Sequence, residues 1–114
     1  MVEKDAVSAF SALAHPLRLR VIRLLMREGP GGLPAGQIAE ALRTPPSTLS
    51  SHLAQLQRTG LVRSERQQQR ILYAASLGGT RALIDFLIQD CCNGHPEVCG
   101  YLGSPSEYLH TGNE

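Results

Sequence analysis

Apolar residues in the first half of the chain recur three and four positions apart, which is the spacing of helices that bury one face. With proline and glycine marking the interruptions, four helices are predicted at residues 4–14, 16–28, 34–43 and 45–58. Val7, Phe10 and Ala14 form the expected apolar face of the first helix. The apolar stripe of the second helix consists of Leu17, Val21, Leu24 and Leu25.

The fourth helix has recognisable start and stop residues. Thr44 is the expected N-cap, and Pro45 suits the first helical position because its missing N–H would have no partner there. Gly60 follows the last turn, where glycine commonly ends a helix. The residues expected to face inward are three leucines, namely Leu49, Leu53 and Leu56.

After residue 60 the pattern changes from helical to extended. Residues 61–66 and 70–75 are predicted to form two short strands, joined by the polar segment 67–69 as a hairpin tip. The glycine pair at 78–79 is expected to lead into a fifth helix at about residues 80–92. The predicted fold class is therefore mainly α with a small β-hairpin.

This order of elements places a helix-turn-helix in the third and fourth helices, with the hairpin as the wing of a winged helix-turn-helix. The distribution of charge fits that interpretation. The chain has a net charge of +1, but residues 15–73 carry nine arginines and three glutamates, a charge of +6, while residues 74–114 carry −4. A basic central segment is typical of a surface that binds nucleic acid.

Polar side chains lie between the buried leucines of the fourth helix and at the tip of the hairpin. Short donors and acceptors can approach base edges and phosphates in a major groove, and arginines of a wing suit phosphates or the minor groove. The candidate DNA contacts of the fourth helix are Ser47, Thr48, Ser50, Ser51, His52 and Gln55. Those of the wing are Arg66, Gln68, Gln69 and Arg70.

Three segments of the chain together resemble the ArsR/SmtB family of metalloregulatory repressors. These are ALAHPLRLRVIRLL, STLSSHLAQLQRTGLV and SERQQQRILYAAS, and the resemblance covers about residues 5–90. It implies a homodimer, built through the first and last helices, that binds an imperfect inverted repeat in double-stranded operator DNA. Two-fold symmetry of a dimer leads to the same expectation for the operator. The pair Pro45-Pro46 departs from the small polar residues that are more usual there.

The three cysteines of the chain, Cys91, Cys92 and Cys99, lie within nine residues, at the end of the fifth helix and just beyond it. Three thiolates without an obvious fourth ligand favour a soft, three-coordinate centre, and trivalent arsenic or antimony prefers that geometry. We therefore expect arsenite or antimony to be the inducer that releases the repressor from an arsenic-resistance operator. No organic cofactor is expected.

Several alternatives for the cysteine cluster remain open. A zinc or cadmium sensor would need a fourth ligand, which His95 or His110 could supply. The resemblance weighs against zinc, because zinc-sensing members carry an Asp-x-His pair where this chain has Asp85-Phe86-Leu87. A redox or persulfide sensor would pair Cys99 with one of the other two cysteines. An enzyme is not expected, because the cysteines lie at a helix C-terminus beside carboxylates, which raises a thiol pKa.

Length and composition set the remaining expectations. With 114 residues the chain is expected to contain a winged helix-turn-helix and dimerisation domain at 1–92 and a metalloid-binding loop with a flexible tail at 93–114. No apolar run approaches the length needed to cross a bilayer, and the N-terminus lacks the layout of a signal peptide. We therefore expect a cytoplasmic protein with no membrane partner, whose cysteines are reduced.

Overall fold

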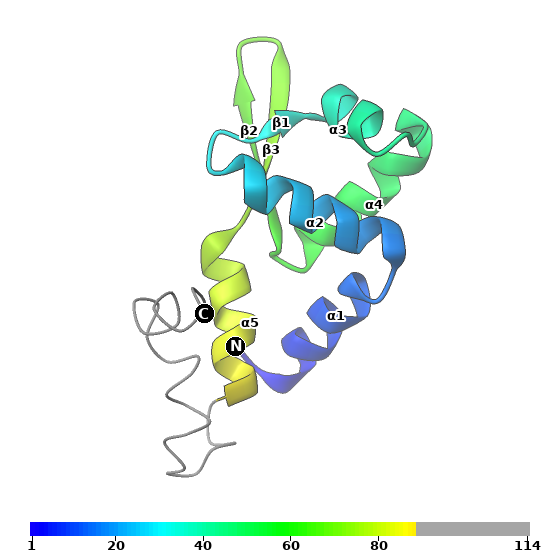
Figure 1. Ribbon diagram of the computed structural model, residues 1–114. Helices are drawn as coiled ribbons and strands as arrows, with labels where there is room; N and C mark the ends of the chain where they lie inside the picture. The colour runs from blue at the N-terminus through cyan, green and yellow to red at the C-terminus, as the bar shows by residue number, and fades with distance from the viewer. Residues whose placement is uncertain (89–114) are drawn as a thin grey trace, which may run out of the picture. The chain divides into compact units, whose positions relative to one another are not determined.

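The computed structural model describes residues 1–88 and has the predicted mixture of helices and a small sheet (Figure 1). Along the chain the elements are α1 (Glu3–Leu13), α2 (Pro16–Glu28), β1 (Leu33–Pro34), α3 (Ala35–Ala41), α4 (Pro46–Arg58), β2 (Val62–Gln67), β3 (Arg70–Ala75) and α5 (Leu77–Ile88). The winged helix-turn-helix prediction is confirmed: α3 packs on α4, and the β2–β3 hairpin follows as the wing.

The chain divides into two compact units, Met1–Leu83 and Ile84–Glu114. The first unit is described throughout, and the second is described for residues 84–88, which are the last residues of α5. The predicted domain boundary after residue 92 and the predicted metalloid-binding loop and tail at 93–114 lie outside the described residues. No helix within residues 1–88 is long and apolar enough to cross a membrane.

The core of the first unit is built on the leucine stripe of α4. Leu49, Leu53 and Leu56 are at most 2% exposed, as their spacing predicts. Val21 and Leu25 of α2 are fully buried, and α2 packs on both α4 and β3. Helix α4 is therefore held from behind by apolar contacts, which allows polar residues on its other side to face outward.

The face of α1 that is buried differs from the predicted one. Ala6, Ala9 and Ala12 are at most 5% exposed, while Val7 is 60% and Phe10 is 38% exposed. The alanine face lies against α2 and α4, where small side chains allow the helices to approach closely. The larger apolar side chains consequently remain on the outer face of α1.

The sheet contains a strand that the sequence analysis missed. β1 is two residues long and pairs antiparallel with β3, where Leu33 lies opposite Tyr73 and Pro34 opposite Leu72, so that the strand order is β1-β3-β2. Periodicity cannot reveal so short a strand. Gly32 precedes it with a φ of +73°, and a Cβ there would overlap the carbonyl group of Tyr73. A glycine is therefore required where the chain enters the sheet.

Two predicted helix starts are wrong. The N-cap of α4 is Pro45 and not Thr44, whose hydroxyl instead donates a hydrogen bond to the carbonyl of Leu42. Helix α5 begins at Leu77 and not at residue 80, because Ser76 accepts a hydrogen bond from the Gly79 N–H at 3.0 Å and thereby caps the first turn. The two glycines consequently lie inside the helix.

Candidate nucleic-acid interface

The N-terminal half of α4 presents a row of exposed hydroxyl groups. Ser47, Thr48, Ser50 and Ser51 are all exposed, as the sequence analysis predicted. The hydroxyls of Ser50 and Ser51 donate to the carbonyls of Ser47 and Thr48, at 3.3 and 3.2 Å. Each hydroxyl oxygen keeps lone pairs that can accept from a base or a bound water. The row therefore offers donors and acceptors of the kind that DNA-binding helices direct at base edges.

No carboxylate occurs in α4, and a basic residue that the sequence analysis did not single out lies just before it. Arg43 is exposed, in the turn between α3 and α4, and has a φ of +51°. A guanidinium at that turn is of the kind that contacts phosphates beside DNA-binding helices. Its signal in the sequence is a single arginine in a short turn, which by itself does not differ from an ordinary surface charge.

His52 has a different environment from the neighbouring hydroxyls. It is half-buried, its Nδ1 lies 3.2 Å from Nη1 of Arg18, and its ring centroid is 4.6 Å from that of His15. Burial lowers the pKa of His52 below its usual 6.5, and the electrostatic interactions with His15 and with the charged guanidinium of Arg18 lower it further. The imidazole ring is therefore uncharged at neutral pH and is hydrogen-bonded to Arg18 of α2.

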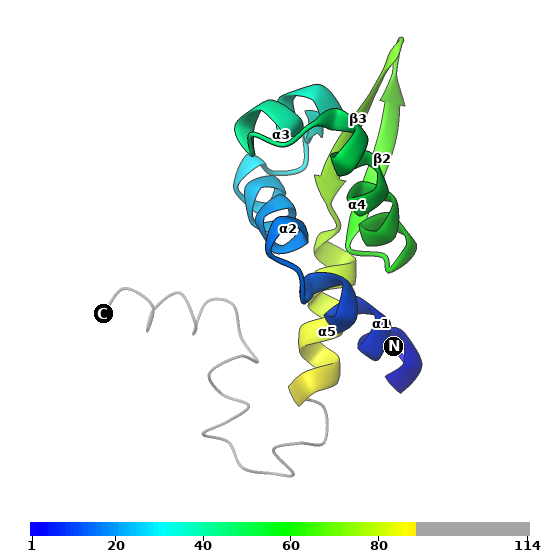
Figure 2. The same ribbon diagram turned by 90° about the vertical axis from the view of Figure 1, so that its right-hand side faces the viewer.

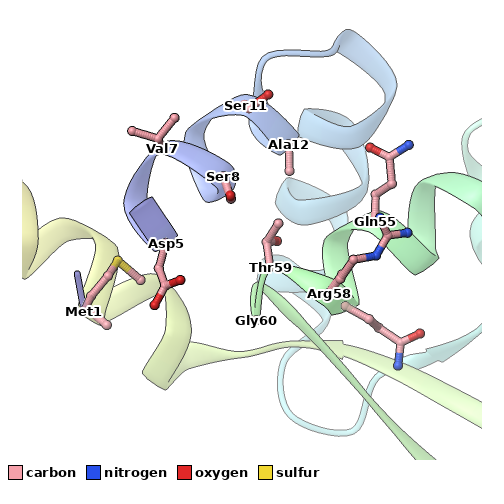
Figure 3. A pocket seen from close by; sticks show the side chains of 12 residues that line it. Met1, Asp5, Val7, Ser8, Ser11, Ala12, Gln55, Arg58, Thr59 and Gly60 are labelled. Carbon is pink, nitrogen blue, oxygen red and sulfur yellow. The ribbon is translucent and has the colours of Figure 1, made fainter. Parts of the chain in front are cut away.

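Gln55 lies one helical turn after Ser51 and is half-buried. It lines a groove of about 820 Å³ between α1 and the end of α4, together with Ser8, Ser11 and Arg58 (Figure 3). The groove also contains the carboxylate of Asp5, so it lacks the uniform positive charge that a polyanion requires. Gln55, which is a predicted DNA contact, therefore lies at the edge of a groove that does not have the charge of a DNA-binding surface.

The wing carries its four predicted residues in exposed positions. Arg66, Gln68, Gln69 and Arg70 all lie at or next to the turn that joins β2 to β3, and Gln68 adopts a φ of +59°. In Figure 2 this turn projects beyond the helices of the first unit. Two side-chain hydrogen bonds orient the hairpin, from Gln57 to Ser64 at 2.8 Å and from Arg63 to the carbonyl of Pro30 at 2.9 Å.

Sequence comparisons relate this arrangement to known regulators. Residues 13–65 match a family model described as a helix-turn-helix domain. The HTH-type transcriptional regulator YgaV of Escherichia coli is 34% identical over 89 residues, which is 78% of this chain and 88% of that protein. The transcriptional activator HlyU of Vibrio cholerae is 31% identical over 90 residues, 79% of this chain and 81% of HlyU. This chain belongs to the winged helix-turn-helix transcriptional regulators.

Solved structures of the family have the same fold. HlyU from Vibrio cholerae superposes with a TM-score of 0.62 at 31% identity, covering 81% of this chain and 99% of HlyU. A further structure of that protein, described as reduced HlyU, superposes with a TM-score of 0.58 at 30% identity, covering 78% and 90%. The homodimeric winged helix-turn-helix domain Mb0332 of Mycobacterium bovis, a possible ArsR-family regulator, has a TM-score of 0.62 at 27% identity, covering 82% and 83%.

Membership of this family makes the chain a DNA-binding transcriptional regulator rather than an enzyme. The structure brings the predicted hydroxyls of α4 together on one exposed surface and places the predicted wing residues at the hairpin turn. It does not bring together three or more His, Cys, Asp or Glu side chains to hold a metal within residues 1–88. The predicted ligands Cys91, Cys92 and Cys99, and the alternative ligands His95 and His110, lie outside the described residues.

Proposed function

We propose that this regulator is a homodimeric repressor that binds an imperfect inverted repeat in its operator and is released by trivalent arsenic or antimony. The observation that carries the DNA-binding part is the exposed row Ser47, Thr48, Ser50 and Ser51 on α4, the proposed recognition helix, which has no carboxylate and lies beside a wing whose turn is flanked by Arg66 and Arg70. Hydroxyls at base edges supply specificity, and arginines at phosphates supply affinity and orientation.

The exposed apolar residues of α1 and α5 support the homodimer. Val7 and Phe10 lie on the outer face of α1, and Leu87 of α5 is 55% exposed. Large apolar side chains gathered on a surface helix favour association, and the family resemblance assigns the dimer contact to the first and last helices. Mb0332 is described as homodimeric, which supports the same assembly for this chain.

The inducer site that we propose consists of Cys91, Cys92 and Cys99. Arsenite carries three hydroxyls, and exchange of these for three thiols forms three As–S bonds and releases three waters with no net release of protons. Binding at the end of the last helix would alter the dimer contact and hence the spacing of the two recognition helices, which must match successive major grooves about 34 Å apart. A coupling free energy of about 1–3 kcal/mol changes operator affinity by roughly 5- to 150-fold.

A thiol redox sensor is the second candidate, and one comparison favours it. A structure of HlyU is described as reduced, which indicates that the redox state of that relative is a variable. In this chain, oxidation would join Cys99 to Cys91 or Cys92 with loss of two electrons and two protons to a peroxide or persulfide oxidant. The same surface would then release DNA in response to an oxidant without any metalloid.

Two measurements test these proposals in sequence. Selection from a random duplex library with the purified protein should enrich an inverted repeat whose half-site centres lie about 10 base pairs, or a multiple of that spacing, apart. Enrichment of a single half-site, or of no sequence, would contradict the dimeric operator. Fluorescence anisotropy on the selected duplex, under strict reduction, should show release by arsenite. Release by peroxide alone would favour the redox sensor, and release by zinc alone would favour the zinc sensor.

A further inference from the structure

Arg18 of α2 connects three helices through one guanidinium group. Its Nε donates a hydrogen bond to the carbonyl of Ala12 in the last turn of α1, at 2.6 Å. Its Nη1 lies 3.2 Å from Nδ1 of His52 on α4. The side chain therefore joins the end of α1 to the recognition helix, across 34 positions of sequence between Arg18 and His52.

This contact determines where the proton of His52 resides. A guanidinium carries donors and no acceptor, so Nδ1 of His52 must be the acceptor and the neutral ring carries its proton on Nε2. His15 has the same tautomer, because its Nδ1 accepts a hydrogen bond from the Leu17 N–H at 3.1 Å. Neither imidazole can bind a metal ion through Nε2 without giving up the bond at Nδ1, and the charge of Arg18 opposes a cation there.

The Nε2–H of His52 remains available as a donor. It has no hydrogen-bond partner among the described residues, and no buried side-chain nitrogen or oxygen in that part of the chain lacks a partner. This N–H therefore reaches the solvent-accessible surface. It lies on the same helix as the exposed hydroxyls, one turn after Thr48.

We propose that Arg18 is a positioning residue for operator recognition, which fixes His52 in the Nε2–H form so that His52 can contact only a hydrogen-bond acceptor on DNA. The acceptor is a purine N7, the O6 of guanine, the O4 of thymine or a phosphate oxygen. Arg18 acts through His52 and does not itself contact DNA. This inference rests on the proposed binding of DNA by α4.

Nuclear magnetic resonance on the free protein tests the first step without DNA. The ring nitrogens of His52 should have the chemical shifts of a single tautomer, protonated at Nε2, with a pKa below 6.5. In Arg18→Met, which keeps the aliphatic stem and loses every donor, both neutral tautomers should appear and the pKa should rise. A wild-type ring protonated at Nδ1 in its neutral form would overturn the proposal, whatever the protein does with DNA.

Operator binding tests the second step. Arg18→Met and His52→Ala should each weaken binding by about 3- to 10-fold, the effect of losing one hydrogen bond. The double variant should be no weaker than His52→Ala alone, because Arg18 acts through His52. Additive losses would mean that Arg18 contacts DNA directly and would overturn the proposal. Arg23→Met, an exposed arginine of the same helix, is the matched control for lost charge.

Two further variants keep the test decisive. His52→Gln retains a donor at the position of Nε2, so it should keep most of the affinity and be insensitive to Arg18→Met. Arg18→Lys retains the charge without the planar group of donors, so it should behave like Arg18→Met rather than like the wild type. Duplexes with 7-deazapurine then test for a purine N7 acceptor, and duplexes with methylphosphonate linkages test for a phosphate acceptor. The modification that removes the acceptor of His52 should abolish the difference in affinity between the wild type and His52→Ala, and a difference that survives both modifications indicates a base oxygen. Failure of the wild-type protein to bind any selected duplex contradicts the proposed function and leaves the tautomer measurement intact.

Discussion

Gly79, in the first turn of α5, lies against the carbonyl oxygen of Gly60, the residue that ends the turn after α4. A Cβ at position 79 would overlap that backbone oxygen, whereas a Cβ at the adjacent Gly78 would meet nothing within 4 Å. The two glycines are neighbours in sequence, but position 79 has no room for a side chain and position 78 has. They therefore form a matched pair for testing how α5 joins the end of α4.

Gly79→Ala should destabilise the protein by about 1–3 kcal/mol, because the backbone at Gly60 must move to admit the methyl group. Gly78→Ala should stabilise it by up to about 1 kcal/mol, since alanine loses less conformational entropy in a helix. Chemical denaturation at fixed protein concentration measures both values. Equal effects of the two substitutions would show that α5 does not approach Gly60 in this way.

The exposed hydroxyls of α4 should contribute to DNA affinity and not to folding. Ser51→Ala should weaken operator binding by about 2- to 10-fold, the range for one lost hydrogen bond, and leave the free energy of unfolding within about 0.5 kcal/mol. Ser8→Ala, an exposed serine on α1, is the control and should leave binding unchanged. Fluorescence anisotropy on the selected duplex measures the affinity. A loss of the same size in Ser8→Ala would remove the specific role of α4.

The wing arginines should determine part of the salt dependence. Arg66→Ala and Arg70→Ala should each lower the slope of log affinity against log salt concentration by about 1, because each loses one phosphate contact. The reduction should be similar for operator and for unrelated duplex DNA, since phosphates carry no sequence information. Arg23→Ala on α2 serves as the control, with an expected change near zero. An unchanged slope in the wing variants would place the wing away from the DNA.

The proposed cysteine site predicts that the response to arsenite can be lost while binding to the operator is kept. Cys99→Ser should keep the operator affinity of the wild type and lose release by arsenite, because two sulfurs remain where three are required. Titration of the reduced protein with arsenite, followed by sulfur–arsenic absorption, should show that the variant no longer forms the three-sulfur complex. If arsenite still releases this variant from DNA, the proposed site is incorrect.

Stability should depend on pH through His52. Its pKa is lowered in the folded protein, chiefly by burial and then by His15 and Arg18, so the unfolded chain binds the proton more readily. This contribution is fully present above the unfolded pKa of about 6.5 and is lost as the pH falls from there through the lowered pKa. The free energy of unfolding of the wild type minus that of His52→Gln should therefore decrease as the pH is lowered below 6.5. A difference that stays constant from pH 7.5 to about 5 would contradict the lowered pKa.

The candidate interface could be predicted from sequence wherever local pattern determines exposure. The spacing of Leu49, Leu53 and Leu56 fixes which face of α4 is buried, so the hydroxyls of Ser47 and Ser51 must lie outside. The environment of His52 could not be predicted in this way. Its partner Arg18 is distant in sequence, and their contact depends on how α2 and α4 pack together.

The sequence by itself determined the order of the five helices and of the two hairpin strands, the leucine stripe of α4 and the polar residues of its outer face. These features depend on helical periodicity and on residues close together in the chain, whose effects are local. The tertiary structure decided which face of α1 is buried, how β1 pairs with β3 and which nitrogen of His52 carries the proton. Each of these depends on contacts between residues far apart in sequence, because only packing brings such groups within the short range of steric and hydrogen-bonding forces.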